Sequence, residues 1–186
     1  MEAIKKIEIN KIGKVILIAV LGTLLLTISA KIKIPFYPVP MTMQTFIVLF
    51  LGIALGPKIG LLTVCLYLFE GIFGLPVFAG TPEKGIGLVY FTGPTMGYLI
   101  GFLVAVYFAG SFKYDKGSIN TFLKLIFSVS FIYILGLIWL GTLIGWAKPI
   151  FKLGAEPFLL AELFKMLLLL FLTPTLLKAK KLIKIT

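Results

Sequence analysis

Most of this chain consists of apolar runs long enough, or nearly long enough, to cross a lipid bilayer, and this feature constrains the fold more than any other. The last run, 158–177, is built mostly from Leu, Phe, Ala and Met. A membrane-spanning helix needs about 20 mainly apolar residues. Inside a bilayer the backbone polar groups must bond within the protein, so such runs form helices. The sequence therefore predicts an all-α integral membrane protein in a lipid bilayer.

Proline, glycine and lysine residues separate the runs and divide the chain into six expected transmembrane helices. More lysines flank the ends that face inward when both termini are inside, so the positive-inside rule predicts cytoplasmic N and C termini. This arrangement predicts a single domain over residues 1–186 and a multi-pass protein of the cell (plasma) membrane. The expected spans are 15–30, 44–55, 59–70, 94–110, 121–143 and 158–177.

Composition excludes several classes of function. The chain is 60% hydrophobic, and its net charge of +11 comes from lysines at the ends of apolar runs, which indicates membrane orientation rather than nucleic-acid binding. It has no His and only one Cys, Cys65, which rules out Ser-His-Asp catalysis and a multi-cysteine metal cage. We therefore expect no catalytic residues, no metal and no cofactor.

Two charged residues, Glu162 and Lys165, lie inside the last apolar run. A charge at the centre of a membrane helix costs at least about 2.5 kcal/mol. The i, i+3 spacing places both residues on one helical face. One interpretation is an ion pair near the membrane surface, with the lysine reaching toward water. The other is a polar ligand site that faces the interior of a helix bundle.

Three irregular segments are predicted on the external side, where they would converge over this charged pair. The segment 31–40 contains three prolines, and the segment 71–93 contains six glycines and two prolines yet stays apolar and aromatic. Irregular backbone at membrane depth is tolerated only where it is buried in protein or lines a cavity. Together with the connector 144–157, these segments predict a ligand pocket near the outer face.

Other side chains suit such a pocket but leave alternatives open. Tyr133 and Trp139 could pack on an apolar ring while donating hydrogen bonds, or could anchor the helix at the lipid interface. Gln44 enters the second helix from the outer side and could instead be a capping or surface amide. In the chemistry of a pocket, Lys165 suits a ligand carboxylate and Glu162 suits ligand N–H groups, such as those of a ureido ring.

Small residues form stripes on two helices. Gly93, Gly97 and Gly101 give a repeated small-xxx-small pattern, which we interpret as an internal packing face. The first run carries Gly22 beside a stripe with four-residue spacing, which favours either ordinary internal packing or a docking face for another membrane protein. The members of that stripe are Ala19, Thr23 and Thr27.

Several short motifs lie along the chain: 38–44 (PVPMTMQ), 55–57 (LGP), 74–80 (GLPVFAG), 93–98 (GPTMGY), Tyr133 to Leu140, and Pro157-Phe158 followed by an acidic residue and Lys165. Together they resemble the BioY family, the biotin-specific substrate-binding (S) components of energy-coupling factor (ECF) transporters. The resemblance extends from the first helix to the sixth, and the joint spacing of the motifs is what makes it specific. The family pattern has Gly-Asp where this chain has Ala161-Glu162.

The resemblance implies a six-helix S-component fold that binds biotin near the outer face. It implies partners as well, namely a transmembrane coupling (T) subunit and two cytoplasmic ATPase subunits. The chain has no P-loop motif of its own, which agrees with ATP hydrolysis in partner subunits. By the resemblance, the stripe on the first helix docks to the coupling subunit. The expected ligand contacts are Glu162, Lys165, Tyr133, Trp139, Gln44, Phe78, Gly80, Tyr90 and Tyr98.

Other functions are possible from the residues alone. The chain could carry or facilitate another small carboxylate-bearing vitamin. An intramembrane enzyme would call for paired acids or His at its centre, where this sequence has Glu162 alone. A scaffold without a small ligand would have no need for the irregular glycine-rich segment.

Overall fold

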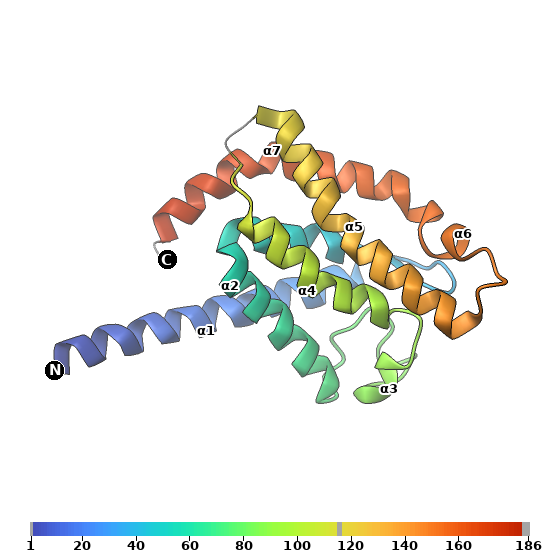
Figure 1. Cartoon of the computed structure of the whole chain (residues 1–186). Helices are drawn as coiled ribbons and strands as arrows, with labels where there is room; N and C mark the ends of the chain where they lie inside the picture. Colours follow the sequence, from blue (N-terminus) through green and yellow to red (C-terminus); the bar gives the residue numbers. More distant parts are fainter. Residues whose placement is uncertain (1, 115–116, 184–186) are drawn as a thin grey trace.

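The protein is a bundle of long helices, described here from a computed structural model that covers residues 2–114 and 117–183. A two-residue antiparallel ribbon, with Lys33 opposite Thr42, follows the first helix. The elements in chain order are α1 (Glu2–Lys31), β1 (Lys33–Ile34), β2 (Met41–Thr42), α2 (Gln44–Ile72), α3 (Leu88–Phe91), α4 (Met96–Ser111), α5 (Gly117–Ile144), α6 (Ile150–Gly154), the 3₁₀ helix η1 (Glu156–Phe158) and α7 (Leu159–Ile183) (Figure 1).

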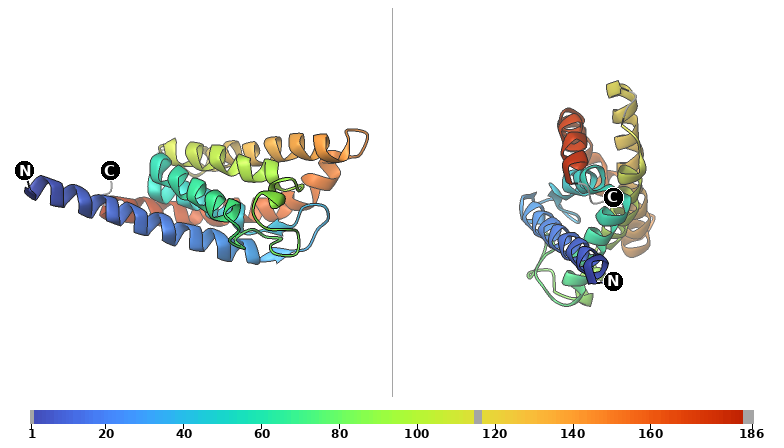
Figure 2. Two further views of the ribbon diagram at one scale, coloured as in Figure 1. Left: turned by 90° about the horizontal axis from the view of Figure 1, so that it is seen from below. Right: turned by 90° about the vertical axis from the view of Figure 1, so that its left-hand side faces the viewer.

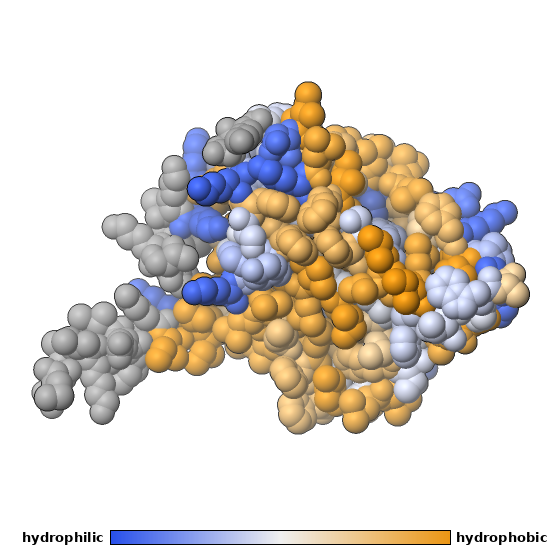
Figure 3. Space-filling view, viewed as in Figure 1, coloured by the Kyte–Doolittle hydropathy of each residue, from blue (hydrophilic) through white to orange (hydrophobic). Residues whose placement is uncertain are grey.

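The outside of the bundle carries many apolar side chains. In the part of the chain that the structure describes, four helices are long and apolar enough to cross a membrane, and α4 is a shorter apolar helix. On α1, for example, Ile16, Leu17 and Leu24 are more than half exposed. Figure 3 shows hydrophobic residues across the middle of one face and hydrophilic residues gathered toward its two ends. The predicted all-α membrane fold is confirmed by this arrangement.

Helix α2 folds back on itself at Gly56. This glycine has φ of 78°, a left-handed conformation that favours glycine, and Pro57 follows it. The Gln44 side chain donates a 2.7 Å hydrogen bond to the hydroxyl of Tyr67. In a straight helix these two residues would lie about 35 Å apart. The predicted turn at 56–58 therefore divides α2 into two adjacent limbs, while the count of six spans stays a prediction.

Two of the three stripe glycines, Gly97 and Gly101 in α4, pack inside the protein as the sequence indicates, while Gly93 precedes the helix and is half-buried. A Cβ atom on Gly101 would lie 2.5 Å from the Cα of Ile132 in α5, and one on Gly97 would meet the carbonyl of Leu135. At the other end of α4, a Cβ on Gly110 would lie 2.5 Å from the backbone nitrogen of Pro57. Helix α4 is thus held closely between α5 and the turn of α2.

The small residues of α1 also make an internal contact. Ala19 and Thr23 are only 1% and 2% exposed, and the Thr23 hydroxyl donates a 2.9 Å hydrogen bond to Glu70 of α2. A Cβ on Gly22 would meet the side chain of Thr63. Thr27 is half-buried and donates to the Thr23 carbonyl. The internal-packing alternative describes Ala19 and Thr23 in this structure, and a docking role for the stripe stays a prediction.

The irregular segments gather at one end of the bundle, as predicted. The start of α1 and the end of α7 point toward the opposite end (Figure 2). Phe36 of the proline-rich segment lies edge-on to Phe158, with ring centroids 5.8 Å apart. The Tyr98 hydroxyl donates a 2.8 Å hydrogen bond to the carbonyl of Gly154. These contacts enclose the space into which the first turns of α7 project.

Candidate ligand-binding site

The centre of the site is the charged pair in the first two turns of α7. Because α7 begins at Leu159, Glu162 and Lys165 lie beside the irregular segments rather than at the middle of the bundle. They are only 4% and 8% exposed. The Nζ of Lys165 lies 2.6 Å from Oε1 of Glu162. Each charge therefore offsets part of the cost of burying the other.

Lys165 is fully engaged with the protein. Besides Glu162, its ammonium group donates to the carbonyl of Thr42 at 2.6 Å and to the hydroxyl of Thr45 at 3.1 Å. An ammonium group has three N–H donors. All three have acceptors here, so a ligand carboxylate would have to displace one of them. The arrangement lets Lys165 hold Glu162 and β2 in place, and its contact with a ligand carboxylate, which the sequence suggests, stays a prediction.

Glu162, in contrast, keeps acceptor capacity. Its Oε1 accepts the hydroxyl of Thr45 at 2.7 Å as well as the ammonium of Lys165. A carboxylate offers about four acceptor sites. Glu162 also lines a cavity between the helices. The carboxylate is thus held in place by two protein donors and can accept further donors from a molecule in the cavity.

The cavity combines aromatic and aliphatic walls with a few polar groups. Its volume of about 50 Å³ exceeds the roughly 10–15 Å³ that one water molecule needs. Such a mixture suits a small ligand with an apolar body and a polar end. The lining residues are Val39, Pro40, Met41, Thr42, Gln44, Thr45, Ala79, Tyr90, Thr95, Tyr98, Leu99, Phe102, Ile132, Tyr133, Phe158 and Glu162.

Five of the nine predicted ligand contacts line this cavity. Gln44 comes from α2, Tyr90 from α3, Tyr98 from α4, Tyr133 from α5 and Glu162 from α7. Tyr98 and Tyr133 lie edge to face with centroids 6.2 Å apart. Residues from five elements therefore meet around one space, and their role as ligand contacts stays a prediction.

The other four lie behind the wall or away from the cavity. Lys165 is one of them. Phe78 is 1% exposed and stacks on Tyr90 at 4.7 Å, and the Gly80 amide donates to the Tyr90 hydroxyl at 3.4 Å. The indole of Trp139 donates to the carbonyl of Gly93 at 2.8 Å. These groups support the residues that line the cavity.

Several residues that line the cavity were not predicted from the sequence. Thr45 binds both members of the charged pair, and Thr95 and Phe158 add a hydroxyl and an aromatic ring. Thr45 and Phe158 stand in or beside stretches that carry the family resemblance, which is the only pattern that could have indicated them. Their side chains are common in any membrane helix.

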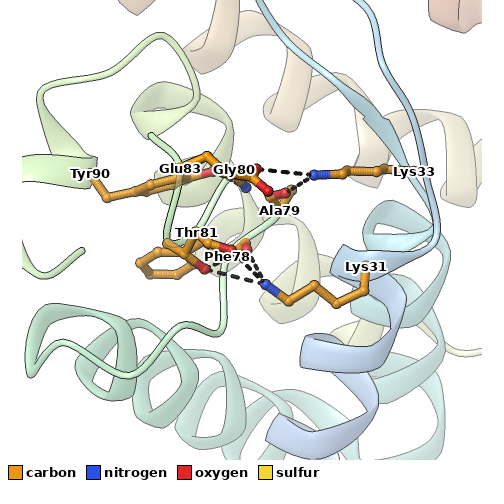
Figure 4. Close-up of polar contacts among 8 residues, drawn as sticks. All are labelled: Lys31, Lys33, Phe78, Ala79, Gly80, Thr81, Glu83 and Tyr90. Atoms are coloured by element: carbon orange, nitrogen blue, oxygen red, sulfur yellow. Dashed lines mark hydrogen bonds and ion pairs between the residues drawn. The ribbon is translucent and has the colours of Figure 1, made fainter. Parts of the chain in front are cut away.

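The glycine-rich segment forms a wall of the cavity through Ala79 and Tyr90. Figure 4 shows two lysines from the end of α1 and from β1 reaching its backbone. The Nζ of Lys33 donates to the carbonyl of Ala79 at 2.8 Å. Burial raises the pKa of the Tyr90 hydroxyl above its ordinary value, which already leaves it neutral near pH 7. The wall therefore presents a neutral polar group to the cavity.

Comparison with known proteins places this architecture in a family. The model of the BioY family matches residues 4–182, nearly the whole chain. The chain belongs to the BioY family. It is accordingly a multi-pass protein of the cell membrane, as its apolar helices indicate.

Relatives and a solved structure agree with this membership. The chain is 35% identical over 153 residues to a probable biotin transporter BioY of Pyrococcus horikoshii, covering 82% of this chain and 90% of that protein. It is 36% identical over 145 residues to the biotin transporter BioY of Thermotoga maritima, covering 77% and 84%. A crystal structure of the S-component for biotin from an ECF-type ABC transporter matches with a TM-score of 0.75 and 26% identity, covering 91% of this chain and 93% of that one.

Proposed function

We propose that this protein is the biotin-binding membrane subunit of an ECF-type transporter. The observation that carries the proposal is the buried carboxylate of Glu162, held by Thr45 and Lys165 at the edge of an aromatic-walled cavity. Biotin offers ureido N–H donors for this carboxylate and an apolar thioether ring for the walls. Membership of the BioY family supports the same ligand. The protein is a transport subunit and not an enzyme.

In this proposal Glu162 accepts the ureido N–H groups, and Lys165 holds that carboxylate in place. Tyr98 and Tyr133 pack against the ring system from one side of the cavity. A hydrogen bond to a charged acceptor contributes about 1.5–3 kcal/mol, so the Glu162 contact accounts for a large part of the discrimination between ligands. Biotin enters from the outer face, where the irregular segments gather.

The energy for uptake comes from other subunits. The chain carries no P-loop, so ATP hydrolysis belongs to partner ATPases joined through a transmembrane coupling subunit. The biotin subunit captures the ligand, and the coupling module, formed by the coupling subunit and the ATPases, drives its movement inward. Uptake of labelled biotin is measured in vesicles with and without the coupling module. Uptake that needs the module supports this proposal, and equal uptake without it indicates simple facilitation.

Calorimetric titration of the purified chain with biotin tests the ligand assignment. We expect saturable binding of one biotin per chain. Biotin methylated at a ureido nitrogen is the matched control ligand, because it keeps the ring and the carboxylate but loses a donor. Its affinity falls by at least about tenfold, since Glu162 then has an unmatched contact. Absence of saturable biotin binding, or equal binding of both ligands, contradicts the proposal.

A further inference from the structure

The end of α1 is tied to the backbone of the glycine-rich wall through Lys31. Its Nζ donates to the carbonyl of Phe78 at 3.0 Å, and to the carbonyl and hydroxyl of Thr81 at 3.2 and 3.3 Å (Figure 4). These contacts use all three N–H donors of the ammonium group. Lys31 therefore closes a loop of nearly 50 residues between the last turn of α1 and the segment 78–81.

Lys33 makes a second tie two residues further on. It donates to the carbonyl of Ala79 at 2.8 Å, and its Nζ lies 3.9 Å from Oε2 of Glu83. Ala79 itself lines the cavity. Three backbone carbonyls of the wall, those of Phe78, Ala79 and Thr81, are thus held by two lysine side chains.

The wall would keep its place in the fold without these ties but would be free to move locally. The ring of Phe78 is anchored by an edge contact with Tyr67 at 5.3 Å and by its stack on Tyr90. Beyond Phe78, the Gly80 amide donates to the Tyr90 hydroxyl and the Gly80 carbonyl accepts the Lys84 amide, while the carbonyls of Ala79 and Thr81 are held by the two lysines. Both lysines are exposed, so water can replace each contact at a modest cost.

From this geometry we infer that Lys31 and Lys33 form a latch that governs how fast the ligand enters and leaves the cavity. When the lysines release the carbonyls of Phe78, Ala79 and Thr81, the wall opens toward the outer side. The ligand passes while the wall is open. The two lysines are positioning residues, because they act through the wall.

The latch predicts an unusual kinetic pattern. All its donors and acceptors belong to the protein, so it has no differential interaction with the bound ligand and does not change the equilibrium affinity. Loss of the latch accelerates association and dissociation by the same factor. Loss of a true ligand contact instead raises the dissociation rate and weakens affinity.

The test uses the full chain with Lys31→Met, which keeps the aliphatic stem but removes the donors. Two readouts are followed. The first is hydrogen–deuterium exchange of the segment 78–85 without ligand, which we expect to accelerate on the order of tenfold. The second is the pair of rate constants for biotin, which both rise by a similar factor while Kd stays within about twofold. Lys33→Met gives the same pattern at about threefold.

Lys58→Met is the matched control, because Lys58 is an exposed lysine at the turn of α2, at the opposite end of the bundle. It should change neither readout. Thr81→Val is the second variant, for the case in which Lys31→Met folds poorly. It removes the hydroxyl that accepts from Lys31 and donates to the Phe78 carbonyl, leaves every charge in place, and should give a smaller version of the Lys31 effect. Unchanged exchange of 78–85 in Lys31→Met, or a rise in dissociation alone, overturns the latch.

The ligand in this test rests on the proposed function, but the exchange readout does not. Failure of the wild-type protein to bind biotin removes the proposed function while the exchange data still judge the latch. Normal biotin binding with unchanged exchange and rates removes the latch and leaves the proposed function in place.

Discussion

Lysines hold backbone carbonyls at two places around the same cavity, one buried in the protein and the other exposed at its surface. Lys165 is 8% exposed and shares its charge with Glu162. Lys31 and Lys33 are exposed, and their main partners are uncharged carbonyls. A buried ammonium group cannot leave its partners without a large desolvation cost, whereas an exposed one can exchange them for water. The first group fixes the chemistry of the site, and the second allows its wall to move.

The largest expected effect comes from breaking the buried pair. Lys165→Met leaves Glu162 as an uncompensated charge, and we expect the free energy of unfolding to fall by about 3–5 kcal/mol. Glu162→Gln leaves the ammonium uncompensated and has an effect of similar size. Denaturant unfolding of the purified variants in detergent measures both. The exposed lysine variants lose far less by the same measurement.

The double variant Glu162→Gln/Lys165→Met sharpens this prediction. Removing both charges leaves no buried ion, so stability recovers most of the loss seen in either single variant. Biotin binding does not recover, because the carboxylate that accepts the ureido donors is gone. A double variant no more stable than the singles would show that the two charges are not energetically coupled.

The sequence pointed to the buried pair, Glu162 and Lys165, but not to the exposed lysines Lys31 and Lys33, and the reason is physical. A charge in an apolar run is conspicuous, since it must find a partner within a turn or in a pocket. The glycines of α4 are similarly visible, and Gly97 and Gly101 pack on α5 as predicted. These features follow from local spacing, which the sequence states directly.

Lys31 and Lys33 looked like ordinary boundary lysines, because their acceptors are backbone carbonyls some 50 residues away. Every residue has a carbonyl, so such pairings leave no trace in the side-chain pattern. For the same reason the sequence did not predict that all three N–H donors of Lys165 have acceptors within the protein, since one acceptor is the carbonyl of Thr42. The stripe on α1 could be recognised, but spacing alone could not tell which helix would cover Ala19.

An intermediate effect is expected at Tyr98, which is buried like Lys165 but uncharged like the carbonyls. Tyr98→Phe removes the 2.8 Å hydrogen bond to the carbonyl of Gly154 and leaves that buried acceptor unpaired. We expect the free energy of unfolding to fall by about 1–3 kcal/mol. Tyr107→Phe is the matched control, because Tyr107 lies on the same helix and is 48% exposed. Equal losses in the two variants would contradict a role for the buried hydroxyl.

The smallest effect should come from Glu83, the carboxylate of the exposed group. Its side chain is 76% exposed and lies 3.9 Å from Lys33, so the ion pair is screened by water and salt. Glu83→Gln keeps the contact between Lys33 and the carbonyl of Ala79, and we expect biotin exchange rates to change by less than about twofold. Stopped-flow binding at low and high salt measures this. If Glu83→Gln accelerated biotin exchange as much as Lys33→Met, the Glu83 carboxylate rather than the Ala79 carbonyl would be the partner that holds the wall. The distinction between a buried ion pair at Lys165 and exposed lysines bound to uncharged carbonyls would then fail.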